Sequence, residues 1–360
     1  MYRVEAKDYE AVQPVFADLD GTHLHITAVL DGNCPGEVYV DDRDQPRTAC
    51  LQSGDCLYLA GAAGNTAFDA ALNAALPRDH YFVLFYDPGT WEGALDGVLD
   101  GTYAVRAARR YYTLRGLRVA GWQDRVPDGY SMQPVDARFL ARDLENKDSV
   151  VGWILDGWRS VDTFLAQGFG SCLVRDTEIV SWSLVDYIKG DRCEMGIETA
   201  RQYQRRGLGT LTAAATAAEA VKRGFATIGW HCWANNAGSM GVAGKVGFEE
   251  AAAYDVFINH WPAENVTDMT PDEYRAFAES YEREFQVRPP VSGYPHIVAA
   301  TAWALSEDQT GCFRHLNRAV DIGWLRSIGQ LRQVWPEFFR NPHLDEMREW
   351  RALARRLTDD

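Results

Sequence analysis

One segment limits the possible folds of this 360-residue chain more than any other. Residues 193–199 (CEMGIET) have the composition of a β-strand, and residues 204–210 (QRRGLGT) follow through a short loop and open a helix. Glycine at positions 207 and 209 lets the backbone approach a bulky ligand closely. The first-turn amides of a helix have no partner within the helix, and the helix dipole favours negative charge beside them. The segment therefore predicts a strand, loop and helix that together bind a pyrophosphate.

The glycine pattern differs from the GxGxxG pattern of dinucleotide-binding folds and from the GxxxxGK[ST] pattern of P-loops. A second pattern follows a predicted strand at residues 227–233, where residues 236–248 are NAGSMGVAGKVGF. In this order, separated by one helix and one strand, the two patterns resemble the Q/R-x-x-G-x-G/A and N-x-x-S-x-x-x-A-x-K-x-G-F motifs of the GNAT superfamily of acetyl-CoA-dependent N-acetyltransferases. The resemblance extends over residues 130–260.

The resemblance implies acetyl-CoA as co-substrate, with no metal. In the family, backbone groups of the strand before the glycine loop pair with the pantetheine amides, which assigns this role to Ile197, Glu198 and Thr199. Asn236 and Ser239 would lie along the pantetheine arm. The pyrophosphate would be held by the loop and the first helical turn, which contain Gln204, Arg205, Arg206, Gly207, Leu208, Gly209 and Thr210. The two adjacent arginines could add charge attraction, and solvated loop arginines are the alternative interpretation.

Acetyl transfer to an alkyl amine needs a base, because such an amine is mostly protonated at neutral pH. Glu194 occupies the position at which many family members carry a catalytic glutamate, and Glu198 lies on the same face of the strand two pleats further along. Either could accept the proton directly or through a water, and a surface charge on an edge strand is the alternative for Glu194. His231 lies between two tryptophans and is interpreted as a hydrogen-bonded core residue.

A second group must protonate the departing thiolate. Many GNAT enzymes carry a tyrosine in the helix before the K-x-G-F element, but this chain has Ala243 there. Ser239 is the preferred substitute because the motif places it beside the pantetheine arm, while Cys232, Tyr254 or a bound water are alternatives. Ser239 and Asn236 could also simply cap their helix.

The order of predicted strands and helices occurs twice, which suggests an internal duplication. We predict a degenerate GNAT-like domain at residues 1–125, an acetyl-CoA-binding GNAT domain at 126–262 and a helical region at 263–360. The fold class is α/β (α+β), with tandem GNAT-like mixed, mostly antiparallel twisted sheets flanked by helices and a small C-terminal all-α region. Predicted strands lie at residues 37–41, 48–51, 56–61, 81–86, 108–114, 171–174, 179–187, 192–199, 227–233 and 251–258, and predicted helices at 67–76, 91–99, 136–144, 150–167, 207–223, 236–246 and 270–285.

The whole chain is most similar to the group that contains the zwittermicin A resistance acetyltransferases, in which a degenerate half precedes the active one. Residues 36–49 resemble the first-half hairpin of that group, and the first half has no Q-x-x-G-x-G before a helix. Its implied role is to complete the acceptor cleft. Near the C-terminus, the small and large residues of 299–303 and 312–319 are spaced as in a tetratricopeptide-type helical hairpin, which would serve as a cap or a docking element.

Composition excludes several classes of protein. A formal net charge of -15 and a pI near 5.0 argue against a surface that neutralises nucleic-acid phosphates. Seven cysteines without a CxxC pair indicate reduced thiols, and no apolar stretch is long enough for a membrane span or a signal peptide. We therefore expect a cytoplasmic protein that binds neither nucleic acid nor membrane.

The sequence thus predicts an N-acetyltransferase that moves the acetyl group of acetyl-CoA directly to a primary amine. The resemblance implies that the acceptor is a small molecule such as an aminated antibiotic or metabolite. Residues 1–100 contain five basic and seventeen acidic residues, so this acceptor is expected to be cationic. The alternatives are a protein or peptide N-acetyltransferase and an acyl-CoA-binding module that has lost transfer. The C-terminal helices could mediate a homodimer or a protein contact.

Overall fold

The computed structural model describes residues 1–119 and 121–358, and the chain divides into two compact units. The first unit is built around a β-sheet and the second is mostly helical. The first comprises Met1–Phe68, Leu84–Ala94 and Ala107–Val256, and the second comprises Asp69–Val83, Leu95–Arg106 and Phe257–Asp360.

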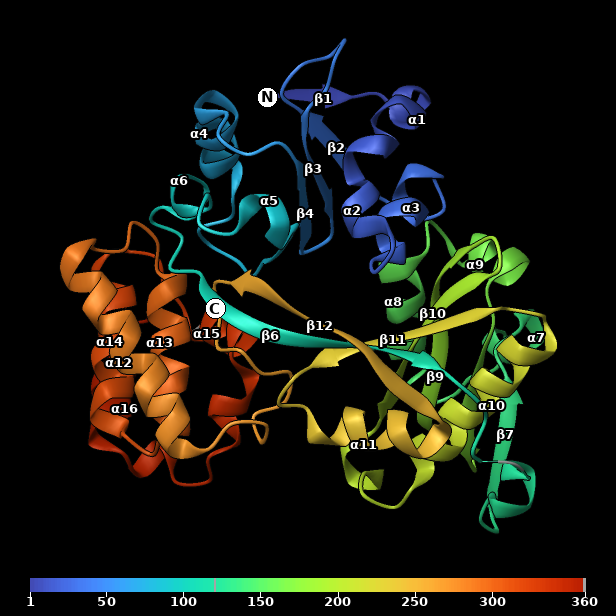
Figure 1. The fold of residues 1–360 in the computed structure, drawn as a ribbon. Coiled ribbons are helices and arrows are strands. Elements are labelled where there is room, and N and C mark those ends of the chain that lie inside the picture. The colour runs from blue at the N-terminus through green and yellow to red at the C-terminus, as the bar shows by residue number, and fades with distance from the viewer. Residues whose placement is uncertain (120, 359–360) are drawn as a thin grey trace. The chain divides into compact units, whose positions relative to one another are not determined.

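Within the described residues, twelve strands form one twisted and mostly antiparallel sheet (Figure 1). From one edge to the other the strands are β1 (Tyr2–Val4), β2 (Glu37–Val40), β3 (Thr48–Ser53), β4 (Cys56–Gly61), β5 (Val83–Tyr86), β12 (Phe248–Ile258), β6 (Val105–Leu114), β11 (Thr227–Trp233), β10 (Arg192–Thr199), β9 (Glu178–Lys189), β8 (Gly170–Arg175) and β7 (Tyr130–Pro134). The pair β10 and β11 is parallel.

The two predicted halves of the sheet are interleaved. Strand β6, from residues before 125, lies between β11 and β12, which both come from residues after 226. Its register with β11 pairs Tyr111 with His231 and Thr113 with Gly229. Neither half can therefore complete its hydrogen-bonded ladder without the other.

Helices cover the second half of the sheet on both faces because strand side chains alternate between the faces. Val185, Met195 and Trp230 belong to the core beneath α10 (Leu208–Lys222) and α11 (Ala237–Val246). Trp182 and Leu184 belong to a separate core beneath α8 (Lys147–Gly157) and α9 (Val161–Gln167). The helices of the first unit are α1 (Tyr9–Val12), α2 (Ala17–Asp20), α3 (Leu24–Leu30), α5 (Pro88–Trp91), α7 (Ala137–Leu140), α8 (Lys147–Gly157), α9 (Val161–Gln167), α10 (Leu208–Lys222) and α11 (Ala237–Val246), and α4 (Thr66–Ala75) begins in it.

The second unit contains α6 (Asp96–Leu99) and the C-terminal helices α12 (Pro271–Val287), α13 (Tyr294–Leu305), α14 (Gln309–Asp321), α15 (Ile328–Val334) and α16 (Arg348–Ala354). A capping box formed by Thr270 and Glu273 starts α12. Gly311 of α14 faces the Trp303 ring of α13, and a Cβ atom at Gly311 would come within 2.6 Å of that ring. The two helices pack closely because this position has no side chain.

The predicted fold class is confirmed, since a large, mostly antiparallel sheet flanked by helices is joined to an all-helical C-terminal region. The predicted helix at 91–99 is instead two short helices, because Gly93 has a positive φ of 81°. The predicted helix at 150–167 is also two helices, since Ser160 caps the start of α9. Helices α1 to α3 and strand β7 were not expected. The three domain boundaries stay predictions.

None of the helices among residues 1–119 and 121–358 has the length and apolar character needed to cross a lipid bilayer.

The position of β6 predicts that a fragment of residues 126–262 will not fold alone. Without β6, strands β11 and β12 keep unpaired edges, which promote aggregation. A fragment of residues 104–262 retains β6 and should be the more soluble of the two, with a cooperative thermal transition by circular dichroism. Equal solubility and equal melting behaviour of the two fragments would contradict this prediction.

Candidate functional site

The central feature of the first unit is the point at which the parallel strands β10 and β11 separate. The ladder between β10 and β11 pairs Cys193 with Ile228 and ends, within the described residues, at Glu194 and Gly229. Beyond it, β10 continues to Thr199 beside β9, and β11 continues beside β6. One edge of β10 from Met195 onward therefore has no neighbouring strand.

Backbone groups of β10 alternate between β9 and this open edge. The Ala200 amide donates to the Val180 carbonyl, and the carbonyls of Gly196 and Glu198 accept hydrogen bonds from Ser183 and Ser181, both at 2.8 Å. The even-numbered residues thus direct their backbone groups toward β9. The amide and carbonyl of Ile197, and the amide of Thr199, are directed to the open edge.

The loop after β10 delivers the start of α10 to the same edge. Two of its residues have left-handed backbone conformations, Arg205 with φ 62° and Gly207 with φ 79°. Leu208 is buried and fixes the first turn of α10. A Cβ atom at Gly209 would lie 2.8 Å from Thr199 Oγ1, so any larger residue here would displace the Thr199 hydroxyl or the start of the helix. The two glycines therefore have different roles, one in the turn and one in the close packing.

Glu194 lies at the branch between the strands, with only 6% of its surface exposed. Its Oε1 accepts a hydrogen bond of 3.0 Å from the Leu24 amide at the start of α3, and lies 3.5 Å from His231 Nε2. Gly229 makes room for the side chain, because a Cβ atom at that residue would come within 2.9 Å of Glu194 Cγ. The carboxylate is therefore enclosed by α3, β11 and its own strand.

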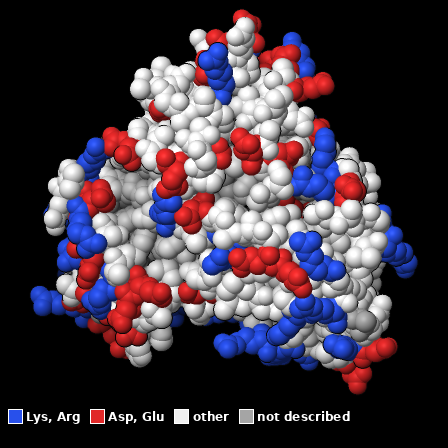
Figure 2. Space-filling view, in the orientation of Figure 1, with Lys and Arg blue, Asp and Glu red and all other residues white. Residues whose placement is uncertain are grey.

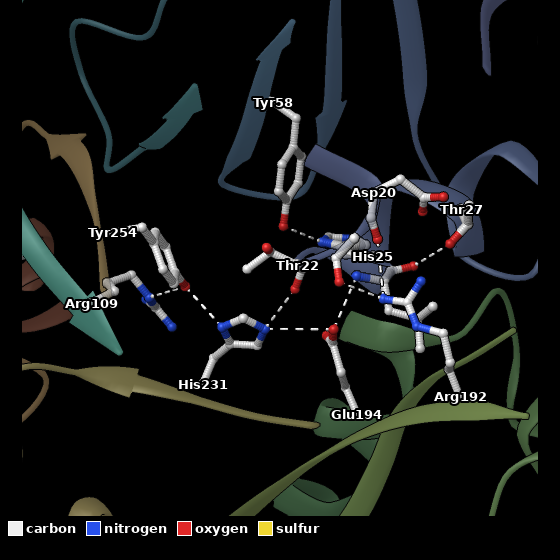
Figure 3. A network of polar contacts seen from close by, with 12 residues as sticks. Asp20, Thr22, His25, Thr27, Tyr58, Arg109, Arg192, Glu194, His231 and Tyr254 are labelled. Carbon is white, nitrogen blue, oxygen red and sulfur yellow. Dashed lines mark hydrogen bonds and ion pairs between the residues drawn. The ribbon is translucent and has the colours of Figure 1, made fainter. Parts of the chain in front are cut away.

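His231 continues this network away from Glu194 (Figure 3). Its Nε2 lies 3.1 Å from the Thr22 carbonyl, which can only accept, so this nitrogen carries the proton. Its Nδ1 then accepts from the Tyr254 hydroxyl at 2.9 Å, and that hydroxyl accepts from Arg109 Nε at 3.2 Å. Burial raises the pKa of Tyr254 to about 12, which keeps its phenol protonated at neutral pH.

A second buried histidine lies on α3. His25 Nε2 donates to Ser53 Oγ at 2.9 Å, because this hydroxyl already donates to the Pro35 carbonyl. Its Nδ1 accepts from Tyr58 at 3.0 Å, and its ring stacks on Tyr187 with centroids 4.4 Å apart. Burial lowers the pKa of His25 to about 4, so its imidazole ring is neutral at neutral pH. It serves to fix the surrounding aromatic side chains.

The start of α11 lies on the opposite face of the sheet from His231, since Trp230 is its neighbour on β11. Asn236 caps this helix by accepting a hydrogen bond from the Ser239 amide at 2.8 Å. Ser239 Oγ accepts from Trp230 Nε1 at 3.0 Å. Ala243 is fully buried in the core beneath the helix. A tyrosine at position 243 would not fit into this core without repacking.

Comparison with known proteins agrees with this geometry. A model of the GNAT acetyltransferase family matches residues 13–257. The chain belongs to this family. It is 24% identical over 257 residues to a protein named uncharacterized N-acetyltransferase YdfB of Bacillus subtilis (strain 168), with 70% of this chain and 95% of that protein covered.

Two solved structures are also similar to this GNAT protein. A GCN5-related N-acetyltransferase-like protein from Streptococcus suis 89/1591 aligns with a TM-score of 0.55 and 20% identity, covering 70% of this chain and 98% of that one. A tandem GNAT protein from the clavulanic acid biosynthesis pathway aligns with a TM-score of 0.48 and 14% identity, covering 71% and 97%.

The residues expected to bind acetyl-CoA are mostly brought together. Ile197 and Thr199 face the open edge of β10, whereas the Glu198 carbonyl is used by Ser181 on the other side. The Gln204 side chain donates to the Thr199 carbonyl at 3.0 Å and so stabilises the loop. The amides of residues 207–210 form the first turn of α10. An open strand edge and a helix start that contains glycine fit the pantetheine and pyrophosphate of acetyl-CoA.

Arg205 and Arg206 are exposed, and the guanidinium of Arg206 lies 5.5 Å from the centre of the Tyr203 ring. The segment 201–210 carries three arginines and no acid. Figure 2 shows basic side chains gathered along the lower part of the visible face, around α10 and α11 in the orientation of Figure 1. Positive potential at this end of the GNAT site would attract the CoA phosphates.

The expected catalytic side chains are not all close together. Glu194 is buried at the branch, but Glu198 is exposed, four residues or roughly 13 Å further along the strand. His231 is hydrogen-bonded, as expected, and in addition lies beside Glu194. Residues that the motifs did not reveal, His25, Tyr58 and the Leu24 amide, come from the first predicted domain. No spacing in the sequence connects them with Glu194.

In the part of the chain that the structure describes, no group of three His, Cys, Asp or Glu side chains is arranged to hold a metal ion.

The space that Gly229 provides leads to a first prediction for the site. Gly229→Ala would place a methyl group within 2.9 Å of Glu194 Cγ and 3.0 Å of Tyr111 Cε2, and so displace the carboxylate. We expect kcat to fall at least about tenfold, with the KM for acetyl-CoA within about twofold of the wild-type value. Gly152→Ala is the control, because a Cβ atom there contacts nothing within 4 Å. Wild-type kcat in the Gly229 variant would contradict the geometry.

Gly209 gives a separate prediction for cofactor binding. In Gly209→Val the new side chain meets Thr199 Oγ1, so the start of α10 must move away from β10. Calorimetric titration with CoA should show affinity at least about tenfold weaker, a loss of about 1.4 kcal/mol. Unchanged CoA affinity would show that this close packing does not shape the CoA site, and Gly152→Ala again serves as control.

Proposed function

We propose that this GNAT protein transfers the acetyl group of acetyl-CoA directly to a primary amine. The observation that carries the proposal is the placement of Glu194. This buried carboxylate lies where β10 leaves β11, next to the strand edge and helix start that fit the cofactor. Direct transfer then needs only that the amine and the thioester meet at this branch.

Acetyl-CoA supplies the activated acetyl thioester. The outward backbone groups of Ile197 would hold the pantetheine arm, and the amides of residues 207–210 would hold the pyrophosphate. Asn236 and Ser239 at the start of α11 would line the arm from the other side. The exposed Arg205 and Arg206 would add attraction for the phosphates.

Glu194 is the proposed base. The Leu24 amide and His231 Nε2 both approach Oε1, which leaves Oε2 to accept a proton from the incoming ammonium group. The amine nitrogen then forms its bond to the carbonyl carbon as the carbon–sulfur bond breaks, and the second proton that this nitrogen releases replaces the one given to the thiolate. Glu198, the second expected base, fits less well because it is exposed and distant from the branch. We assign His231 and Tyr254 to positioning the carboxylate and stabilising its charge.

Ser239 is the proposed donor of a proton to the thiolate. Trp230 Nε1 donates to its oxygen, and a hydroxyl that accepts a hydrogen bond becomes a better donor. Its own proton can therefore point toward the pantetheine side of α11. Tyr254 is the alternative, since its hydroxyl belongs to the chain that ends at Glu194.

The proposed acceptor is a small cationic amine. The acidity of residues 1–100 and the similarity to the zwittermicin A resistance group support an aminated antibiotic or metabolite, acted on in the cytoplasm. A protein or peptide amine is the alternative, supported by the packed hairpin of α13 and α14, which would act as a tetratricopeptide-like docking element or a dimer contact. Release of CoA thiol from acetyl-CoA with a panel of amines and peptides separates these acceptors.

An acyl-CoA-binding module without transfer activity is the second candidate function, and the buried Ala243 favours it because the usual tyrosine is missing. Tight CoA binding with no turnover on any small amine or peptide N-terminus would support this candidate. Acetylated product detected by mass spectrometry would exclude it.

The role of Glu194 predicts the effect of its neutral isostere. Glu194→Gln keeps the shape and the acceptor for the Leu24 amide but cannot take a proton, so kcat should fall about 100-fold or more. The KM for acetyl-CoA should stay within about twofold of the wild-type value. The control is Glu198→Gln, which should retain most activity because that side chain is exposed. A larger loss in the Glu198 variant than in the Glu194 variant would reverse the assignment.

A further inference from the structure

A β-bulge lies beside Glu194. Glu194 pairs with Tyr187 of β9, but the next residue of β10, Met195, pairs with Val185, so Asp186 is an extra residue in β9. A bulge bends its strand and redirects a side chain, and such features are concentrated at functional sites. Here it turns the Asp186 carboxyl toward α8.

Helix α8 holds the bulge through three contacts. Trp153 Nε1 donates to Asp186 Oδ1 at 2.7 Å, and Trp158 Nε1 donates to the Val185 carbonyl at 2.9 Å. Gly157 packs on the backbone of Asp186, where a Cβ atom would lie 3.1 Å from the Asp186 carbonyl oxygen. The position of the carboxyl is therefore fixed by the fold, as a binding group requires.

Asp186 and Trp153 lie over Gly196, just beyond the branch. A Cβ atom at Gly196 would be 3.1 Å from Asp186 Oδ2 and 2.4 Å from the Trp153 ring. Gly196 is two residues after Glu194 on the same strand, so the two positions share one face of the sheet. Two carboxyl groups and an indole ring thus surround the face of β10 on which the amine would approach Glu194.

The carboxyl of Asp186 has no fixed counter-cation. Among the described residues, no Lys or Arg forms an ion pair with it, and the donor that its Oδ1 meets is the neutral indole of Trp153. Burial, together with the nearby Glu194 and Asp156 carboxylates, raises its pKa to about 7. The side chain nevertheless keeps part of its surface exposed, as do Trp153 and Tyr187. A largely buried carboxyl without a paired Lys or Arg is stabilised in its ionised form when a bound ligand supplies the positive charge.

We propose that Asp186 and Trp153 form a binding subsite for an ammonium group of the acceptor, next to Glu194. This inference rests on the proposed acetyl transfer and names the feature of the acceptor that the site selects. The carboxylate pairs with the ammonium, and the aromatic rings of Trp153 and Tyr187 add cation–π attraction. Selection for a cation at the point of transfer thus comes from one bulge residue, in addition to the general acidity of residues 1–100.

The test compares two amines with aromatic rings in the intact chain. Benzylamine is cationic at pH 7.5 and aniline is neutral. With saturating acetyl-CoA, the wild-type protein should have a lower KM for benzylamine than for aniline. Asp186→Asn should raise the KM for benzylamine at least about tenfold and leave the KM values for aniline and acetyl-CoA within about twofold.

Asp156→Asn is the matched control, because it removes the same charge from an exposed position on α8. If Asp186→Asn does not fold, Trp153→Phe replaces it, since this change removes the indole donor but keeps an aromatic ring. It should raise the KM for benzylamine by about threefold or more. Unchanged KM values for benzylamine in these variants, with Glu194→Gln inactive, would overturn the subsite and leave the acetyl transfer intact.

The pH dependence gives a second readout. The groups that face Asp186 are Glu194 and Cys193 of β10, Asp156 of α8, the adjacent Tyr187 and Cys34. The ammonium binds the ionised carboxylate, which is present above a pKa of about 7, so the KM for benzylamine should rise as pH falls through 7. The rise should be absent in Asp186→Asn.

A binding measurement separates the two proposals if no amine is acetylated. Calorimetric titration of benzylamine into the complex with CoA should show binding by the wild-type chain and about tenfold weaker binding by Asp186→Asn. That result without turnover would support the subsite and overturn the transfer. Equal binding, or no binding, by both chains would overturn the subsite.

Discussion

The turn between α2 and α3 is joined to the branch of the sheet by four polar contacts, and the site depends on them. Arg192 donates to the carbonyls of Asp20 and Gly21, His231 donates to the carbonyl of Thr22, and Glu194 accepts from the amide of Leu24. The last of these joins residues 170 positions apart. A buried carboxylate is stable only when hydrogen bonds replace its lost hydration. The turn supplies such a bond and thereby holds the Glu194 side chain at the branch.

These contacts explain why a GNAT site built on β10, α10 and α11 needs the residues that precede it. The elements proposed to bind the cofactor are local, since β10, the glycine loop and α10 are consecutive in the chain. The side that holds Glu194 is not local, because it combines α3, β4 and β6 with β11 and β12. The first predicted domain therefore contributes backbone groups and aromatic walls to chemistry for which it has no motif.

The local half of this arrangement could be predicted from the sequence. The strand, glycine loop and helix of residues 192–222 are where the sequence places them, because glycine spacing, an apolar strand and an alanine-rich helix each act over a few residues. Glu194 was singled out because many family members carry a glutamate at its position, and its catalytic role stays a prediction. Whether it is enclosed or exposed depends on α3, and this helix is too short to leave a clear periodic signal.

The bulge at Asp186 and the insertion of β6 could not be predicted for a related reason. A bulge depends on the register of two strands. The apolar residues of β9 alone do not indicate which of its residues is left without a partner on β10. The pairing of β6 with β11 joins distant segments that each resemble ordinary strands. His231 was correctly expected to be hydrogen-bonded, but its partners Thr22 and Tyr254 are set by this distant pairing.

The insertion of β6 also has a consequence for the time at which the protein can fold. During synthesis, β6 emerges long before its two neighbours in the sheet, β11 and β12. Thr113 of β6 pairs with Gly229 of β11, and β12 is complete only when Ile258 has been added. Pairings between distant segments form slowly because closure of the long loop precedes any gain in contacts. The backbone groups along both edges of β6 therefore stay unpaired in the nascent chain until most of the sheet has been translated. In this interval the chain is prone to aggregate.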